Sequence, residues 1–121
     1  MSLEIRSILG RGVLKDERVT FRCVNADTDI GHYVLLRTGS RDGVVNTGVK
    51  NAMWFPDKIV QKGDLVVVYT RAGNQSEKAL NTGKKAHFFY WGLSAPIWSK
   101  DEAGVVLLNA PEWDARLAQD L

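Results

Sequence analysis

Four consecutive aromatic residues, Phe88 to Trp91, constrain the fold of this chain more than any other feature. Successive side chains of a β-strand point to opposite faces, so Phe88 and Tyr90 share one face. The opposite face carries His87, Phe89 and Trp91. One set is expected in the core. Because the other set is also apolar, it is either covered by another element or exposed as an interaction patch.

Alternating and β-branched runs dominate the rest of the chain, and the helical period is almost absent. The run from Leu65 to Thr70 is apolar on both faces, which predicts a central strand. About eight short strands separated by turn clusters are typical of a sandwich or barrel. The expected strands are Leu3–Leu9, Arg18–Val24, Tyr33–Arg37, Val44–Val45, Ala52–Phe55, Leu65–Thr70, His87–Trp91 and Gly104–Asn109.

The 121 residues contain no repeat, no low-complexity run and no linker, so residues 1–121 are predicted to form one domain. A polar loop is expected from Arg71 to Lys85, and a short helix over Glu112–Gln119, opened by Pro111. The single cysteine, Cys23, excludes an internal disulfide and lies on the apolar face of its strand, which predicts a buried thiol.

Three blocks of sequence, in order, resemble the lamin tail domain. The first contains an acidic residue that opens a strand, an Asn that ends it and an Asp-Ile-Gly step into the next strand. The second combines an aromatic-Pro corner with a Gly-Asp turn, and the third joins an aromatic run to a Val-Leu strand. The blocks are Glu17–Arg22 with Asn25 and Asp29–Leu35; Trp54–Asp57 with Lys62–Asp64 and Tyr69–Thr70; and Phe89–Gly92 with Trp98 and Val105–Ala110.

The resemblance covers residues 17–110 and implies a fold and a mode of action. The implied fold is all-β, an immunoglobulin-like β-sandwich of about 7–9 short strands, here followed by a short helix-like C-terminal tail. The chain resembles a free-standing, bacterial-type copy of this non-catalytic domain, which would act through partners or through self-assembly. In nuclear lamins the domain is an accessory interaction module with reported DNA and chromatin contacts.

No group of residues forms a recognisable catalytic, metal or cofactor motif. His32 lies beside Asp29, as a base and its orienting group would, but no motif supplies a nucleophile, so we expect a turn histidine. His87 is expected at a strand edge, and the two histidines lack the close-spaced partners of a zinc site. Asp27 with Asp29 lacks the rest of a calcium loop. We therefore predict no enzyme, no metal and no cofactor.

The charge is uneven along the chain and suggests an anionic partner or contacts between unlike surfaces. Residues 37–100 carry a net charge of +6, and residues 101–121 carry −4. Basic residues in turns would form a cationic rim if the turns cluster, and such a rim would hold phosphates without reading bases. The alternative is a solvated, solubilising surface. The candidate nucleic-acid-binding residues are Arg37, Arg41, Arg71, Lys78, Lys84 and Lys85.

Tryptophans are the candidates for a protein partner. Trp98 follows Pro96 and Trp113 lies in the tail, so these two are expected to reach a partner or to cover the aromatic strand. Trp54 and Trp91 complete the candidate partner-binding residues.

The sequence thus predicts a non-catalytic binding or assembly module that works through self-association or a partner protein. The alternative is a nucleic-acid-binding domain that uses the basic turns. No secretory signal and no membrane span is visible, so we expect a cytoplasmic protein with no membrane contact.

Overall fold

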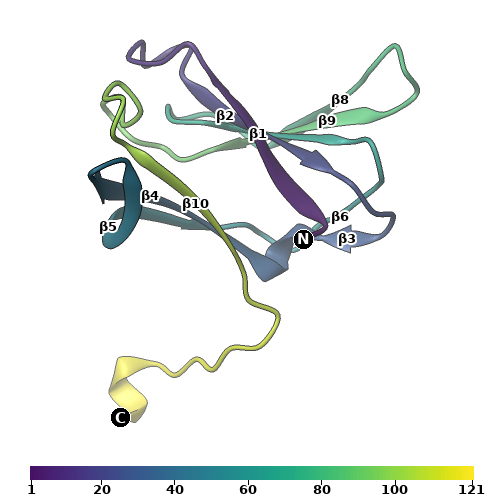
Figure 1. Ribbon diagram of the computed structural model, residues 1–121. Helices are drawn as coiled ribbons and strands as arrows, with labels where there is room; N and C mark the ends of the chain where they lie inside the picture. Colours follow the sequence, from purple (N-terminus) through teal and green to yellow (C-terminus); the bar gives the residue numbers. More distant parts are fainter.

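The computed structural model describes residues 1–121 and contains ten strands, two single-turn 3-10 helices and no α-helix (Figure 1). The strands are β1 (Leu3–Leu9), β2 (Arg18–Cys23), β3 (Thr28–Asp29), β4 (Tyr33–Arg41), β5 (Val44–Trp54), β6 (Ile59–Val60), β7 (Leu65–Tyr69), β8 (Ser76–Ala79), β9 (Lys85–Tyr90) and β10 (Gly104–Asn109). The 3-10 turns are η1 (Ile30–His32) and η2 (Ala118–Asp120).

Two sheets form the body of the domain and a two-stranded ribbon lies beside them. The larger sheet has the order β1-β2-β7-β9-β8, the smaller has the order β10-β4-β5, and β3 pairs with β6. All pairs are antiparallel except β7 with β9. The predicted all-β sandwich is confirmed, and the Val-rich run forms the middle strand of the larger sheet. The immunoglobulin-like topology stays a prediction.

Two segments differ from their predicted structures. Val44–Val45 and Ala52–Phe55 are predicted as separate short strands, but one long strand, β5, joins them and ends at Trp54, because it pairs with β4 across two irregularities in register. The expected loop Arg71–Lys85 contains β8, an edge strand with four exposed residues. Neither face of β8 is buried. Its sequence therefore lacks the alternation of apolar and polar residues from which a strand is predicted.

The predicted helix over Glu112–Gln119 is also wrong for this structure. Residues 111–117 have no regular secondary structure, and only Ala118–Asp120 forms a single 3-10 turn. Helices shorter than about 12–15 residues are marginal in water unless they pack against something. Residues 111–121 are all exposed, so no packing supports a helix.

Aromatic side chains join the two sheets in a core of thirteen buried residues. Phe55 makes edge-to-face contacts with Phe21 and with Phe89, at centroid distances of 5.9 and 5.6 Å. Trp98 is 1% exposed and is the largest fully buried side chain. Trp98 is therefore not available to a partner, which corrects its assignment as a partner-binding residue; it covers the aromatic strand from within the chain instead. The half-buried Trp91 packs against it at 6.3 Å.

The buried carboxylate of Glu17 explains why Trp98 lies inside. It accepts hydrogen bonds from the backbone N–H groups of Ile97 and Trp98, each at 3.0 Å. It also accepts the Gly12 N–H at 3.0 Å and the Thr70 hydroxyl. Burial raises the pKa of Glu17, but the Thr70 hydroxyl and the three backbone N–H groups outweigh it and hold the pKa below its ordinary value of 4.5.

Replacing Trp98 with alanine should lower the free energy of unfolding by about 3–5 kcal/mol, because it leaves a large cavity in the core. Replacing the exposed Trp113 with alanine should lower it by about 1 kcal/mol or less. Urea denaturation of both variants at low protein concentration measures the difference. Equal losses for the two variants would contradict the assignment of Trp98 to the core.

Acid should destabilise the fold through Glu17. A depressed pKa means that the unfolded chain takes up the proton first, so stability is full at neutral pH and falls as the pH drops below about 4.5. Glu17→Gln should cost about 3 kcal/mol at neutral pH, since an amide cannot accept all four bonds. Its stability should then fall less on acidification than that of the wild type or of the exposed control Glu4→Gln. Parallel pH profiles for all three proteins would refute this role.

Candidate interaction surfaces

The outer face of the smaller sheet is apolar. Tyr33 and Leu35 of β4 are buried in the core, so the alternate residues of this strand point outward. Leu36 and its neighbours across the sheet are partly or fully exposed. The register aligns six outward side chains in two rows across the three strands. We call them the apolar face: Leu108, Val34 and Trp54 in one row, and Val106, Leu36 and Ala52 in the other.

The chain beyond β10 touches this face at one point. Trp113 packs edge-to-face on Trp54, with ring centroids 4.8 Å apart. Trp54 also donates its indole N–H to the Gly31 carbonyl at 2.6 Å, which fixes the ring at the end of its row. Trp54 is 50% exposed and Trp113 is 62% exposed. Of the four candidate tryptophans, the structure thus brings these two together at the surface, places Trp98 in the core and leaves Trp91 half-buried against it.

The outer face of the larger sheet carries a second cluster of aromatic rings. Tyr69 and Tyr90 stack with their centroids 5.4 Å apart, and Phe88 lies 6.4 Å from Tyr69. The Arg71 guanidinium lies over both tyrosines, 4.6 Å from the Tyr69 centroid and 5.1 Å from the Tyr90 centroid. All three rings are half-buried. The second aromatic set of β9 is therefore neither fully covered nor fully exposed.

Basic side chains share this outer face with the rings. Arg18 lies 5.7 Å from the Tyr69 centroid, and Arg22 and Arg6 border the same hollow beside Leu65. Lys78 of β8 pairs with Ala86 and points to the same side. None of these cations forms an ion pair with a carboxylate. We call this surface the basic-aromatic face: Arg6, Arg18, Arg22, Arg71, Lys78, Tyr69, Phe88 and Tyr90.

The predicted cationic rim of turn residues is not formed as one cluster. Arg37 turns inward and donates to the Ile97 carbonyl at 3.1 Å, whereas Arg41 lies at the β4–β5 hairpin. Lys84 lies along Gly63, and Lys85 pairs with Glu77. Only Arg71 and Lys78 belong to the basic-aromatic face.

Sequence reasoning missed three of the five cations on that face, Arg6, Arg18 and Arg22. The signal was present in β2, where the residues that alternate with the buried Val19 and Phe21 include two arginines.

His87 is buried, and the prediction of a strand-edge position is wrong. It is 3% exposed because β9 lies between β7 and β8. Its Nε2 lies 2.9 Å from Asp64 Oδ2, and its Nδ1 lies 3.5 Å from Glu77 Oε2. Burial raises the pKa of Asp64, but the hydrogen bond with His87 and two backbone N–H groups outweigh it and lower that pKa. The pair joins the start of β7 to β9.

A hollow of about 390 Å³ lies beside this pair but contains no serine, threonine or cysteine that His87 would activate. His32 is half-exposed, 3.7 Å from Asp29, in the predicted turn position. No three His, Cys, Asp or Glu side chains come together to hold a metal ion.

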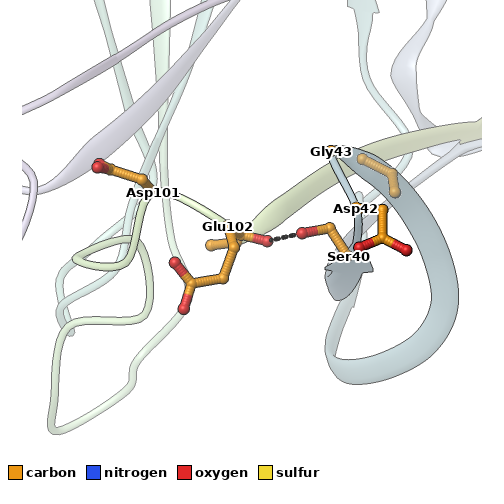
Figure 2. A pocket seen from close by; sticks show the side chains of 7 residues that line it. Ser40, Asp42, Gly43, Asp101 and Glu102 are labelled. Carbon is orange, nitrogen blue, oxygen red and sulfur yellow. Dashed lines mark hydrogen bonds between the residues drawn. The ribbon is translucent and has the colours of Figure 1, made fainter.

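A hollow of about 410 Å³ lies between the β4–β5 turn and the turn before β10 (Figure 2). The Ser40 hydroxyl donates to the Glu102 carbonyl at 2.7 Å and joins the two turns. Figure 2 shows that the carboxylates of Asp101 and Glu102 point away from that of Asp42. Asp101 also accepts a hydrogen bond from Arg11. These acidic side chains therefore do not converge on a common ligand position.

Comparison with protein-family models, curated proteins and solved structures finds no match to this chain. The resemblance to the lamin tail domain stays a prediction. No helix of the chain is both long enough and apolar enough to cross a membrane.

Proposed function

We propose that this domain is a non-catalytic assembly module that associates with a second copy of itself through the apolar face. The observation that carries the proposal is the pair of apolar rows across β10, β4 and β5. Antiparallel sheets that cover a core on one side usually present polar side chains on the other. Six apolar outward residues on three adjacent strands form the kind of exposed patch that marks an interaction site.

The contrast with the larger sheet strengthens the proposal. Its outer face carries the five cations of the basic-aromatic face, whereas none of the six residues of the apolar face is polar. A surface without charge has no electrostatic preference for an unlike partner, and it is compatible with an identical copy. Two-fold symmetric contacts of this kind use the same patch on both copies.

Ala52→Glu tests the proposal because Ala52 is exposed and lies on the apolar face. The matched control is Ser76→Glu, an exposed strand residue on the outside of the other sheet. We expect the wild type and the control to dimerise in sedimentation equilibrium at micromolar concentrations. The Ala52→Glu variant should dissociate at least tenfold more readily, since two carboxylates would be buried in the contact. A wild type that stays monomeric throughout, or variants that behave alike, would refute the proposal.

A second candidate function, binding of single-stranded nucleic acid, is supported by the basic-aromatic face. Five unpaired cations supply contacts for phosphates, and three half-buried rings supply surfaces on which bases stack. The backbone at Gly73 lies against the Tyr90 ring, where an added Cβ would come within 2.5 Å. The Tyr69 ring is likewise occupied by Tyr90 and by the Arg71 guanidinium, so stacking would use mainly Phe88.

Titration with a labelled oligonucleotide at several salt concentrations tests this candidate. The logarithm of the affinity should fall linearly with the logarithm of the salt concentration, because bound phosphates release counterions. Arg22→Ala should reduce that slope by about one phosphate contact, whereas Arg41→Ala on the hairpin should leave it unchanged. An absence of binding at low ionic strength would rule this function out.

A further inference from the structure

The arm, defined as residues Pro111–Leu121, is separate from the rest of the domain. The last backbone hydrogen bond to the body is from Ala110 N–H to the His32 carbonyl, at 2.7 Å. Beyond it, the arm has only local backbone bonds and the single ring contact of Trp113 with Trp54. Figure 1 shows the arm running away from the sheets and ending clear of them. Most of its surface is therefore free for another molecule.

The arm nevertheless has the sequence of an amphipathic helix. Its large apolar residues, Trp113, Leu117 and Leu121, are spaced by four and would form one stripe. Pro111 suits the first helical position, and Glu112 with Arg116 forms a favourable i,i+4 pair. Leu117 and Leu121 are 64% and 87% exposed, so this stripe has no partner on its own domain.

We propose that the arm of one copy folds into a helix on the apolar face of a second copy. As a helix, the eight residues after Trp113 are about 12 Å long, and three strands span about 10 Å between their outer axes. The stripe is therefore long enough to cross all three strands. Packing against the sheet supplies the stabilisation that so short a helix lacks in water.

A second copy is the occupant because of where Trp113 holds the arm. Trp113 lies on its own Trp54 at the end of one apolar row, and the following residues continue away from the sheets. Leu117 and Leu121 are thus presented to a neighbouring molecule. Reciprocal exchange about a two-fold axis would cover both apolar faces and place both Trp54–Trp113 pairs near the axis. This inference rests on the proposed self-association and specifies what covers the face.

The test uses the full chain with the stripe changed. The double variant Leu117→Asp with Leu121→Asp should weaken dimerisation at least 100-fold in sedimentation equilibrium, because two buried leucines become charged. The control, Ala115→Asp with Gln119→Asp, adds the same charge on the opposite side of the helix and should change the affinity less than about threefold. Carbon-13 chemical shifts of residues 112–120 should become helical as dimer forms.

Cross-linking decides whether the contact is between chains. Leu117→Cys mixed with Leu36→Cys should give an oxidised heterodimer, whereas Gln119→Cys mixed with Leu36→Cys should not. If Ala52→Glu abolishes dimers but the Leu117 and Leu121 substitutions do not, the apolar faces of two copies associate without the arm. In that case the proposed role of the arm fails and the proposed self-association stands. If the wild type is monomeric, the proposed function fails as well. A single chain that carries both Leu36→Cys and Leu117→Cys tests the alternative. If it forms an internal disulfide efficiently while the mixed single variants form no heterodimer, the arm folds onto its own apolar face, and the exchange between two copies is overturned.

Discussion

The buried carboxylate of Glu17 is the interaction on which the rest of the structure depends. A single side chain satisfies backbone N–H groups from the β1–β2 loop and from the segment before β10, and it accepts the hydroxyl that follows β7. Glu17 and Trp98 are 81 positions apart in sequence. An ionised acceptor makes each bond stronger than a neutral one would. Glu17 thereby fixes the segment that carries Trp98 over the core.

The position of that segment determines which side chains of the two sheets fill the core and which remain on the outer faces. With Trp98 inside, the core is filled by aromatic and β-branched residues from both sheets, and the outward residues are left to define the surface. One outer face carries the basic-aromatic face, and the other carries the six uncharged residues of the apolar face. The proposed self-association through the apolar face would leave the basic-aromatic face open to the proposed nucleic-acid ligand.

Local pattern was sufficient to predict the regions where each strand has its own apolar signal. The run Leu65–Thr70 reads as a central strand because both of its faces are buried, and Cys23 reads as core because it alternates with Phe21. The same reasoning failed for β8, whose residues are all exposed, and for Trp98, whose burial depends on Glu17. His87 was misplaced for a similar reason, since its partner Asp64 lies 23 positions away and only the parallel pairing of β7 with β9 joins them. All six residues of the apolar face lie in predicted strands, but only the pairing of β10 with β4 and of β4 with β5 places them side by side, and local pattern does not reveal that pairing.

The central claim is that association buries the outer face of the smaller sheet. The most direct measurement is the relaxation of methyl protons by a soluble paramagnetic agent, followed by NMR as the protein is diluted. Methyl groups of Val34, Leu36, Val106 and Leu108 should be shielded at high concentration and become accessible on dilution. The exposed methyl groups of Val44, on the β4–β5 hairpin, should stay accessible throughout. Apolar-face methyl groups that remain as accessible as Val44 at every concentration would contradict the account.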